Sequence, residues 1–151
     1  MLGDGIIGSV RFGIVGELAA TQSVVIEVPR WSFVKRKLDG RVHFVSPLPC
    51  PYNYGSILDV IAADGDPLDA LVLGPRLSRG HTIETQVRAV MGFRDAGLDD
   101  PKVVCSAFAL SVAQQRGVER FFALYAMMKR SMGRARGASG ETRCTGWLAL
   151  E

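Results

Sequence analysis

The sequence predicts a mainly β protein, of the α+β class, with a helix near its C-terminal end. Residues 82–95 alternate between apolar and polar side chains, which is the pattern of a long strand with one buried face. Asp39-Gly40 separates two strand-like segments and is a strong signal for a two-residue β-hairpin turn. Residues 118–129 instead carry apolar side chains at helical spacing. These three patterns favour a fold in which strands predominate.

Length and composition are those of one globular domain, and we expect residues 1–151 to form a single domain. The net charge of +3 is modest, and no basic run is long enough to be a nucleic-acid-binding tail. No apolar run approaches the ~20 residues of a membrane span, and the N-terminus lacks the basic segment of a signal peptide. Three widely spaced cysteines fit a reducing cytoplasm. We therefore expect a cytoplasmic protein without a membrane partner.

The first 62 residues alternate between strands and turn segments. Glu27 stands inside the first strand, where it lies either at a solvated edge or in a polar cavity. Three prolines at positions 47–51 exclude a central strand there, so we expect an ordered loop. The expected elements are an extended arm or short strand to about Ser23, strands at 24–29, 31–38 and 41–45, a loop at 47–55 and a strand at 57–62.

Three carboxylates within six residues precede a buried strand at 70–73. Asp64, Asp66 and Asp69 belong to the motif D-G-D-P-L-D. At a separation of ~4 Å and an effective dielectric constant of about 20, each pair of like charges costs about 4 kcal/mol. The side chains therefore either spread into water, as in an ordinary Asp-rich turn, or hold divalent cations. An EF-hand loop is excluded, because it needs glycine at its sixth position and glutamate at its twelfth.

A second acidic segment follows the strand at 82–95, whose expected buried face carries Ile83, Thr85, Val87, Ala89, Met91 and Phe93. This segment contains Asp95 and Asp100 and ends at Lys102. Two acidic loops at strand ends suggest that both meet at one end of the fold and share metal. The remaining expected elements are a strand at 103–110, a helix at 118–129 and a strand at 142–150.

Together these motifs resemble the soluble, magnesium-dependent inorganic pyrophosphatases. The resemblance covers roughly residues 24–102, with weaker matches at 121–125 and 146–147. Its signature is D-G-D-P-L-D, accompanied by V-V-I-E-V-P, P-Y-N-Y-G and the D-x-x-x-x-D-x-K that ends at Lys102. The resemblance implies an OB-like, closed or partly open antiparallel β-barrel with one or two peripheral helices. It also implies a homo-oligomer, which is often a hexamer in bacterial relatives.

The same resemblance implies hydrolysis of inorganic pyrophosphate to two orthophosphates by attack of a metal-activated water. Mg²⁺ would be the cofactor, with Mn²⁺ as a substitute, because hard cations favour oxygen ligands. Asp66 would be the general base. The implied phosphate-binding residues are Lys35, Arg41, Tyr54, Lys102 and Tyr125. The implied metal ligands are Asp64, Asp69 and Asp100, with Asp95 and Glu27 completing the sites.

Three positions depart from the family pattern. Lys37 replaces an acidic residue, Cys50 replaces a tyrosine, and Ala126 replaces a lysine. We expect Lys37 or Lys129 to supply the missing cation. The departures leave open a second hypothesis, a non-catalytic relative that binds metal or phosphate. A third hypothesis, an OB-type nucleic-acid module, is disfavoured because such a module needs aromatic stacking platforms on a basic face.

Overall fold

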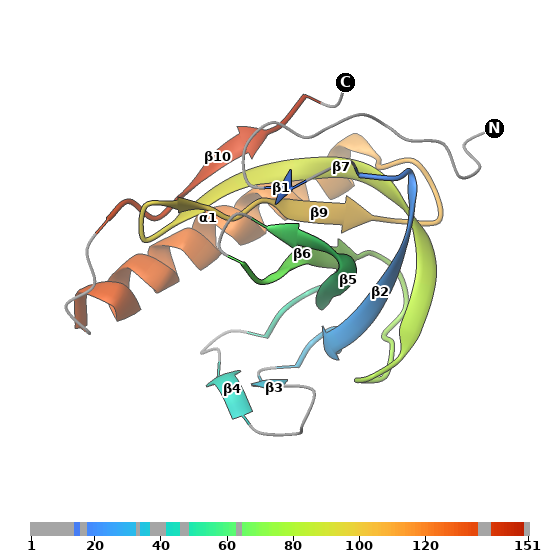
Figure 1. The fold of residues 1–151 in the computed structure, drawn as a ribbon, viewed down its shortest axis with the longest axis horizontal. Coiled ribbons are helices and arrows are strands. Elements are labelled where there is room, and N and C mark those ends of the chain that lie inside the picture. The colour runs from blue at the N-terminus through green and yellow to red at the C-terminus, as the bar shows by residue number, and fades with distance from the viewer. Residues whose placement is uncertain are drawn as a thin grey trace.

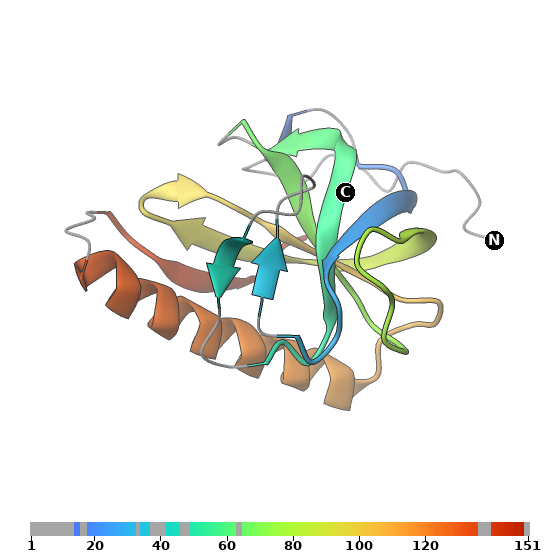
Figure 2. The same ribbon diagram turned by 90° about the horizontal axis from the view of Figure 1, so that it is seen from below.

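Five strands close into a barrel, and a long helix lies along its outer surface (Figures 1 and 2). The computed structural model describes residues 14–15, 18–32, 34–36, 42–45, 49–62, 65–135 and 140–149, with backbone alone for 14–15, 34–36, 42–45 and 134–135. The elements within these residues are β1 (Ile14–Val15), β2 (Thr21–Val28), β3 (Val34–Arg36), β4 (Val42–Val45), β5 (Asn53–Ala62), β6 (Pro67–Val72), β7 (Thr82–Asp95), β8 (Leu98–Asp99), β9 (Lys102–Cys105), α1 (Val112–Ala135) and β10 (Arg143–Trp147).

The barrel strands run in the order β5-β2-β7-β9-β6, and β6 pairs with β5 again to close the ring. Every pairing in this ring is antiparallel except that of β6 with β9. β1 pairs with β5, and both β8 and β10 pair with β7. The β3–β4 hairpin forms a separate two-stranded sheet, which lies below the barrel in Figure 1. The predicted OB-like, mainly β fold is confirmed.

Two hydrophobic cores share the barrel wall. The first fills the barrel interior and includes Leu68, Ala70 and Val103. The second lies between the outer surface of the barrel and α1, and it includes Leu71, Val104 and Phe122. Alternate residues of β6 and β9 therefore face opposite cores, as expected when side chains alternate along a strand. Side chains on the outer face of these two strands point toward the helix side of the molecule.

A register shift in β7 changes which of the two cores its odd-numbered residues face. The pairing of β7 with β9 shifts between Val87 and Ala89. Val87 and Val90 belong to the barrel core, whereas Met91 and Phe93 belong to the core beneath α1. The expected single apolar face from Ile83 to Phe93 is wrong, because one extra residue in a strand reverses the face of all that follow. The bounds of β7 agree with the prediction.

The predicted hairpin around Asp39-Gly40 is confirmed by the antiparallel pairing of β3 with β4, although the turn lies outside the described residues. The predicted loop at 47–55 is wrong at its end, because β5 begins at Asn53. Gly55 allows β5 to approach β2 here, since a Cβ atom would overlap the Val25 carbonyl oxygen. The predicted strand at 103–110 is also too long, since β9 ends at Cys105.

The helix begins six residues earlier and ends six residues later than predicted. Its start is fixed by a capping box. The backbone N–H of Gln114 donates to the Ser111 hydroxyl oxygen (3.1 Å), and the backbone N–H of Ser111 donates to the side-chain oxygen Oε1 of Gln114 (2.9 Å). Val118, Phe122 and Ala126 form its buried stripe. Neither α1 nor any other helical segment among the described residues combines the length and apolarity needed to span a membrane.

Candidate functional site

A buried lysine joins the two acidic segments. Lys102 begins β9 in parallel register with Asp69 of β6, and its side chain is only 1% exposed. Its Nζ donates to Asp69 Oδ2 at 2.7 Å and to Asp100 Oδ2 at 2.8 Å. The predicted meeting of the two acidic segments is thereby confirmed.

Aromatic rings enclose the Lys102 ammonium on its other sides. Nζ lies 5.3 Å from the ring centroid of Phe93 and 5.9 Å from those of Tyr54 and Tyr125. Burial alone would lower the pKa of Lys102, but the charges of Asp69 and Asp100 outweigh it and raise the pKa above its ordinary value. The lysine therefore stays charged at neutral pH.

Tyr54 is a neutral phenol at physiological pH. Burial and the negative charge of Asp69 raise its pKa well above the ordinary value of 10.0. A neutral hydroxyl remains a hydrogen-bond donor, so Tyr54 can contribute to an anion site without adding negative charge.

The free energy of unfolding is expected to fall as pH rises above about 10, near the ordinary pKa values of Tyr and Lys. Both Tyr54 and Lys102 have folded-state pKa values above their ordinary ones. The native state therefore retains protons that the unfolded chain loses, so their stabilising contribution is complete below this pH and declines above it. Urea unfolding between pH 8 and 11 measures the slope. Tyr54→Phe should flatten it, and an identical slope in that variant would contradict the assignment.

Acidic side chains on β2 and β6 lie on the same outer surface of the barrel. Ser56 of β5 is the register partner of Asp69 on β6, and opposite residues of paired strands share a face. The Ser56 hydroxyl donates to Glu27 Oε1 on β2. Glu27 thus contacts the residue that lies opposite Asp69, on the partly buried outer surface of the barrel, so it is neither at a solvated edge nor in a closed cavity.

The β7–β8 hairpin positions Asp95 and Asp100. Ala96 and Gly97 both have positive φ, 51° and 85°, which is the signature of a type I′ turn. Arg94 secures the turn by donating to Asp99 Oδ1 (2.9 Å) and to the Gly97 carbonyl oxygen (2.6 Å). The expected loop after Asp95 is therefore wrong, since the segment forms a hairpin whose turn has alanine instead of the usual asparagine or aspartate.

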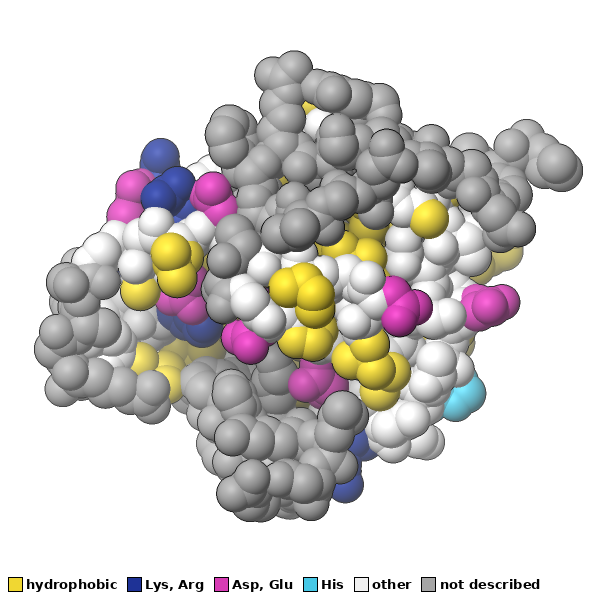
Figure 3. Space-filling model, viewed as in Figure 1, with side chains coloured by type: hydrophobic (Ala, Val, Ile, Leu, Met, Phe, Trp, Pro, Cys, Tyr) yellow, Lys and Arg dark blue, Asp and Glu magenta, His cyan; other side chains and the backbone are white. Residues whose placement is uncertain are grey.

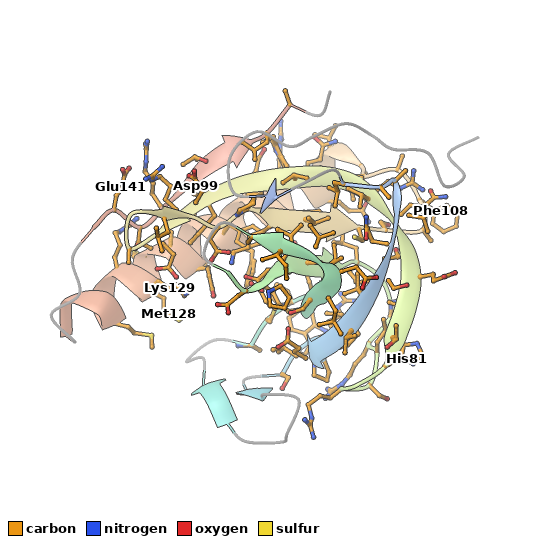
Figure 4. The ribbon with its side chains drawn as sticks, in the orientation of Figure 1. His81, Asp99, Phe108, Met128, Lys129 and Glu141 are labelled. Atoms are coloured by element: carbon orange, nitrogen blue, oxygen red, sulfur yellow. The ribbon has the colours of Figure 1, made fainter. Side chains whose placement is uncertain are left out.

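A second lysine lies beside Asp95. Lys129 Nζ is 2.5 Å from Asp95 Oδ2 and 5.4 Å from the ring centroid of Tyr125. Tyr125 is thus flanked by both Lys102 and Lys129. Figure 4 shows Lys129 and Asp99 on the same side of the molecule, where α1 passes the β7–β8 hairpin. Lys129 is one of the two lysines for which the sequence predicts a role in the site.

Several predicted site residues are not placed in this cluster by the structure. Asp66 lies exposed in the bend before β6, where its carbonyl oxygen accepts a hydrogen bond from the Ala62 amide (2.9 Å). Asp64, Arg41 and the side chain of Lys35 lie outside the described residues, as does Lys37. Across the described part of the chain, no three Asp, Glu, His or Cys side chains form a group that could hold a metal ion.

The donor set nevertheless suits a hard divalent cation. Asp69 and Asp100 both direct a carboxylate oxygen at the Lys102 ammonium, Glu27 accepts from Ser56 opposite Asp69, and Asp95 is paired with Lys129. Oxygen ligands of this kind are those that Mg²⁺ prefers. Figure 3 shows acidic side chains across the middle of the face that is seen in Figure 1, beside exposed hydrophobic side chains.

Two of the departures from the family pattern are core positions in the fold. Ala126 is 2% exposed and packs with Phe122 between α1 and the barrel. Cys50 belongs to the same core, and burial raises the pKa of its thiol to about 11. Both side chains therefore pack in the core between α1 and the barrel.

Comparison with known proteins gives consistent results. A family model described as "Inorganic pyrophosphatase" matches residues 24–141. An inorganic pyrophosphatase of Gluconobacter oxydans is 37% identical over 92 residues, 55% of this chain and 53% of that protein. One of Aeropyrum pernix is 33% identical over 105 residues, 64% of this chain and 60% of that protein. The chain thus spans little more than half the length of the curated relatives it matches.

Among solved structures, the inorganic pyrophosphatase of Thermus thermophilus superposes with a TM-score of 0.71 at 26% identity. The superposition covers 87% of this chain and 83% of the Thermus protein.

Proposed function

The chain belongs to the inorganic pyrophosphatase family, and we propose from this that it hydrolyses inorganic pyrophosphate to two orthophosphates. The observation that carries the proposal is the Lys102 cluster. One buried ammonium is bonded to carboxylates from both acidic motifs, Asp69 and Asp100, and is surrounded by Tyr54 and Tyr125. A fixed cation beside oxygen ligands for metal is the arrangement that binding and cleaving a phosphoanhydride requires.

We assign the metal ligands to the carboxylates of the two acidic motifs. Asp69 and Asp100 would hold Mg²⁺ together with Asp64, while Asp95 and Glu27 would complete the sites; Mn²⁺ would substitute. Bound divalent cations would neutralise pyrophosphate and lower the pKa of a water molecule. The oxygen-only donor set supports Mg²⁺ or Mn²⁺ over zinc, which favours nitrogen and sulfur ligands.

The protein residues would divide the remaining work. Lys35, Arg41, Lys102 and the hydroxyls of Tyr54 and Tyr125 would bind phosphate oxygens and stabilise charge on the leaving phosphate. Asp66 would accept a proton from the attacking water as general base. The exposure of Asp66 supports this role, because a base at the rim can reach both solvent and a bound substrate.

The protein is further proposed to act in the cytoplasm and to form a homo-oligomer, as its bacterial relatives often do. Three free cysteines, of which Cys50 and Cys105 are buried, support a reducing compartment. Substrate binding would involve pyrophosphate alone, without nucleic acid or membrane.

Phosphate release from pyrophosphate tests the proposal. We expect turnover with Mg²⁺, loss of turnover when a chelator removes the metal, and recovery when Mg²⁺ or Mn²⁺ is restored in excess. Activity that persists in chelator would contradict the metal-dependent mechanism. Tight Mn²⁺ binding without turnover would instead favour the alternative of a non-catalytic relative, for which the substitutions at Lys37, Cys50 and Ala126 are the motivating observation.

A further inference from the structure

Lys129 bonds a carboxylate that the proposed function assigns to metal. Its Nζ lies 2.5 Å from Asp95 Oδ2. An ammonium and a divalent cation on the same carboxylate repel each other strongly at such short distances. A cation that binds Asp95 through Oδ2 would therefore displace Lys129 from this atom.

We propose that Lys129 occupies Asp95 in the metal-free protein and passes to a phosphate group of the substrate when a cation binds Asp95. The inference rests on the proposed function, because that function makes Asp95 a metal ligand. Lys129 is then a phosphate-binding residue that becomes available only when metal is present.

The geometry allows this exchange. Lys129 lies four residues after Tyr125 on α1, so both side chains project from the same face of the helix. Its ammonium is 5.4 Å from the Tyr125 ring, and the Lys102 ammonium is 5.9 Å from that ring. The side chains of Lys129 and Asp95 are 26% and 32% exposed, so ions can reach the pair.

The packing of α1 explains why the cation stands at position 129. The family pattern has lysine at position 126, but Ala126 here lies in the buried stripe with Val118 and Phe122. Alanine at that position adds to this apolar packing and supplies no charge. Position 129 is on the same helix, is partly exposed and borders the acidic hairpin.

Binding measurements on the full chain test the exchange without requiring turnover. Calorimetry with Mn²⁺ alone should show tighter binding by Lys129→Met, about tenfold, because Asp95 no longer has to be released. Inorganic phosphate at saturating Mn²⁺ should bind that variant more weakly, also about tenfold. Methionine preserves an unbranched side chain beside Tyr125 and removes the charge.

Three further variants sharpen the result. Lys129→Arg retains the charge and should leave Mn²⁺ affinity close to that of the unmodified protein. Arg120→Met removes an exposed cation from the same helix and should change neither affinity. Asp95→Asn releases Lys129 without metal, so the metal-free variant should bind inorganic phosphate more tightly than the metal-free unmodified protein.

Unchanged Mn²⁺ affinity in Lys129→Met would show that the lysine does not compete with the cation. Weaker Mn²⁺ affinity would show that the lysine positions Asp95 for the cation. Either result would overturn the proposal. Tighter Mn²⁺ binding with unchanged phosphate affinity would overturn the transfer to phosphate. Absence of Mn²⁺ binding by the unmodified protein would overturn both this inference and the proposed metal site. If Lys129→Met shows both predicted shifts, in Mn²⁺ affinity and in phosphate affinity, but the unmodified protein does not hydrolyse pyrophosphate, the exchange is supported and the proposed hydrolysis is contradicted.

Discussion

Replacing Asp66 with asparagine is expected to lower kcat for pyrophosphate hydrolysis by about 10²–10⁴-fold, the usual contribution of a general base. Asparagine has nearly the same shape but cannot accept a proton at neutral pH. Because Asp66 lies exposed at the bend before β6, the substitution should leave the barrel and the Lys102 cluster intact. Steady-state phosphate release with Mg²⁺ measures the effect.

Asp59→Asn is the matched control, since Asp59 is an exposed aspartate on the neighbouring strand β5. We expect its kcat to equal that of the unmodified protein. Mn²⁺ calorimetry on Asp66→Asn separates the base from a metal ligand, because loss of the base should leave Mn²⁺ affinity unchanged. An Asp66→Asn variant with full kcat would remove Asp66 from the mechanism.

The second large effect concerns stability. Lys102→Met is expected to lower the free energy of unfolding by about 3–5 kcal/mol in the absence of metal, because removing one partner leaves buried charge uncompensated. The Asp69 and Asp100 side chains are only 17% and 12% exposed and both bond this lysine. Urea unfolding at neutral pH in chelator measures the loss.

An exposed ion pair provides the control for Lys102→Met. Arg143 pairs with Glu141, and their side chains are 59% and 51% exposed. Arg143→Met should lower the free energy of unfolding by less than about 1 kcal/mol, since water screens exposed pairs. Equal losses in the two variants would show that Lys102 does not compensate Asp69 and Asp100.

Much of the fold follows from local sequence patterns. The alternation at 82–95 gave the correct bounds of β7, and Asp39-Gly40 correctly predicted the β3–β4 hairpin. The errors arise where distant contacts decide the local structure. The register shift after Val87 depends on pairing with β9, and the extension of β5 to Asn53 depends on pairing with β6. The capping box at Ser111 was present in the sequence and could have corrected the start of α1.

The site was predictable to a similar degree. The motifs identified Asp69, Asp100 and Lys102 as members of one cluster, and the structure joins them. Phe93 and Ser56 were not proposed as neighbours of the site, because ordinary strand residues carry no sequence signal for a position beside a charge. The attachment of Lys129 to Asp95 joins residues 34 apart and depends on how α1 packs against the β7–β8 hairpin.

The parallel pairing of β6 with β9 has a consequence for folding kinetics. Asp69 and Lys102 are register partners although 33 residues separate them, so their cluster forms only when this non-local pairing is made. Non-local pairings of this kind are slow to form, because the loop between them must first be ordered. A ligand that needs both β6 and β9 binds only the native state and stabilises it by mass action. Cations held by Asp69 and Asp100 would therefore bind late in folding and delay the separation of these two strands during unfolding.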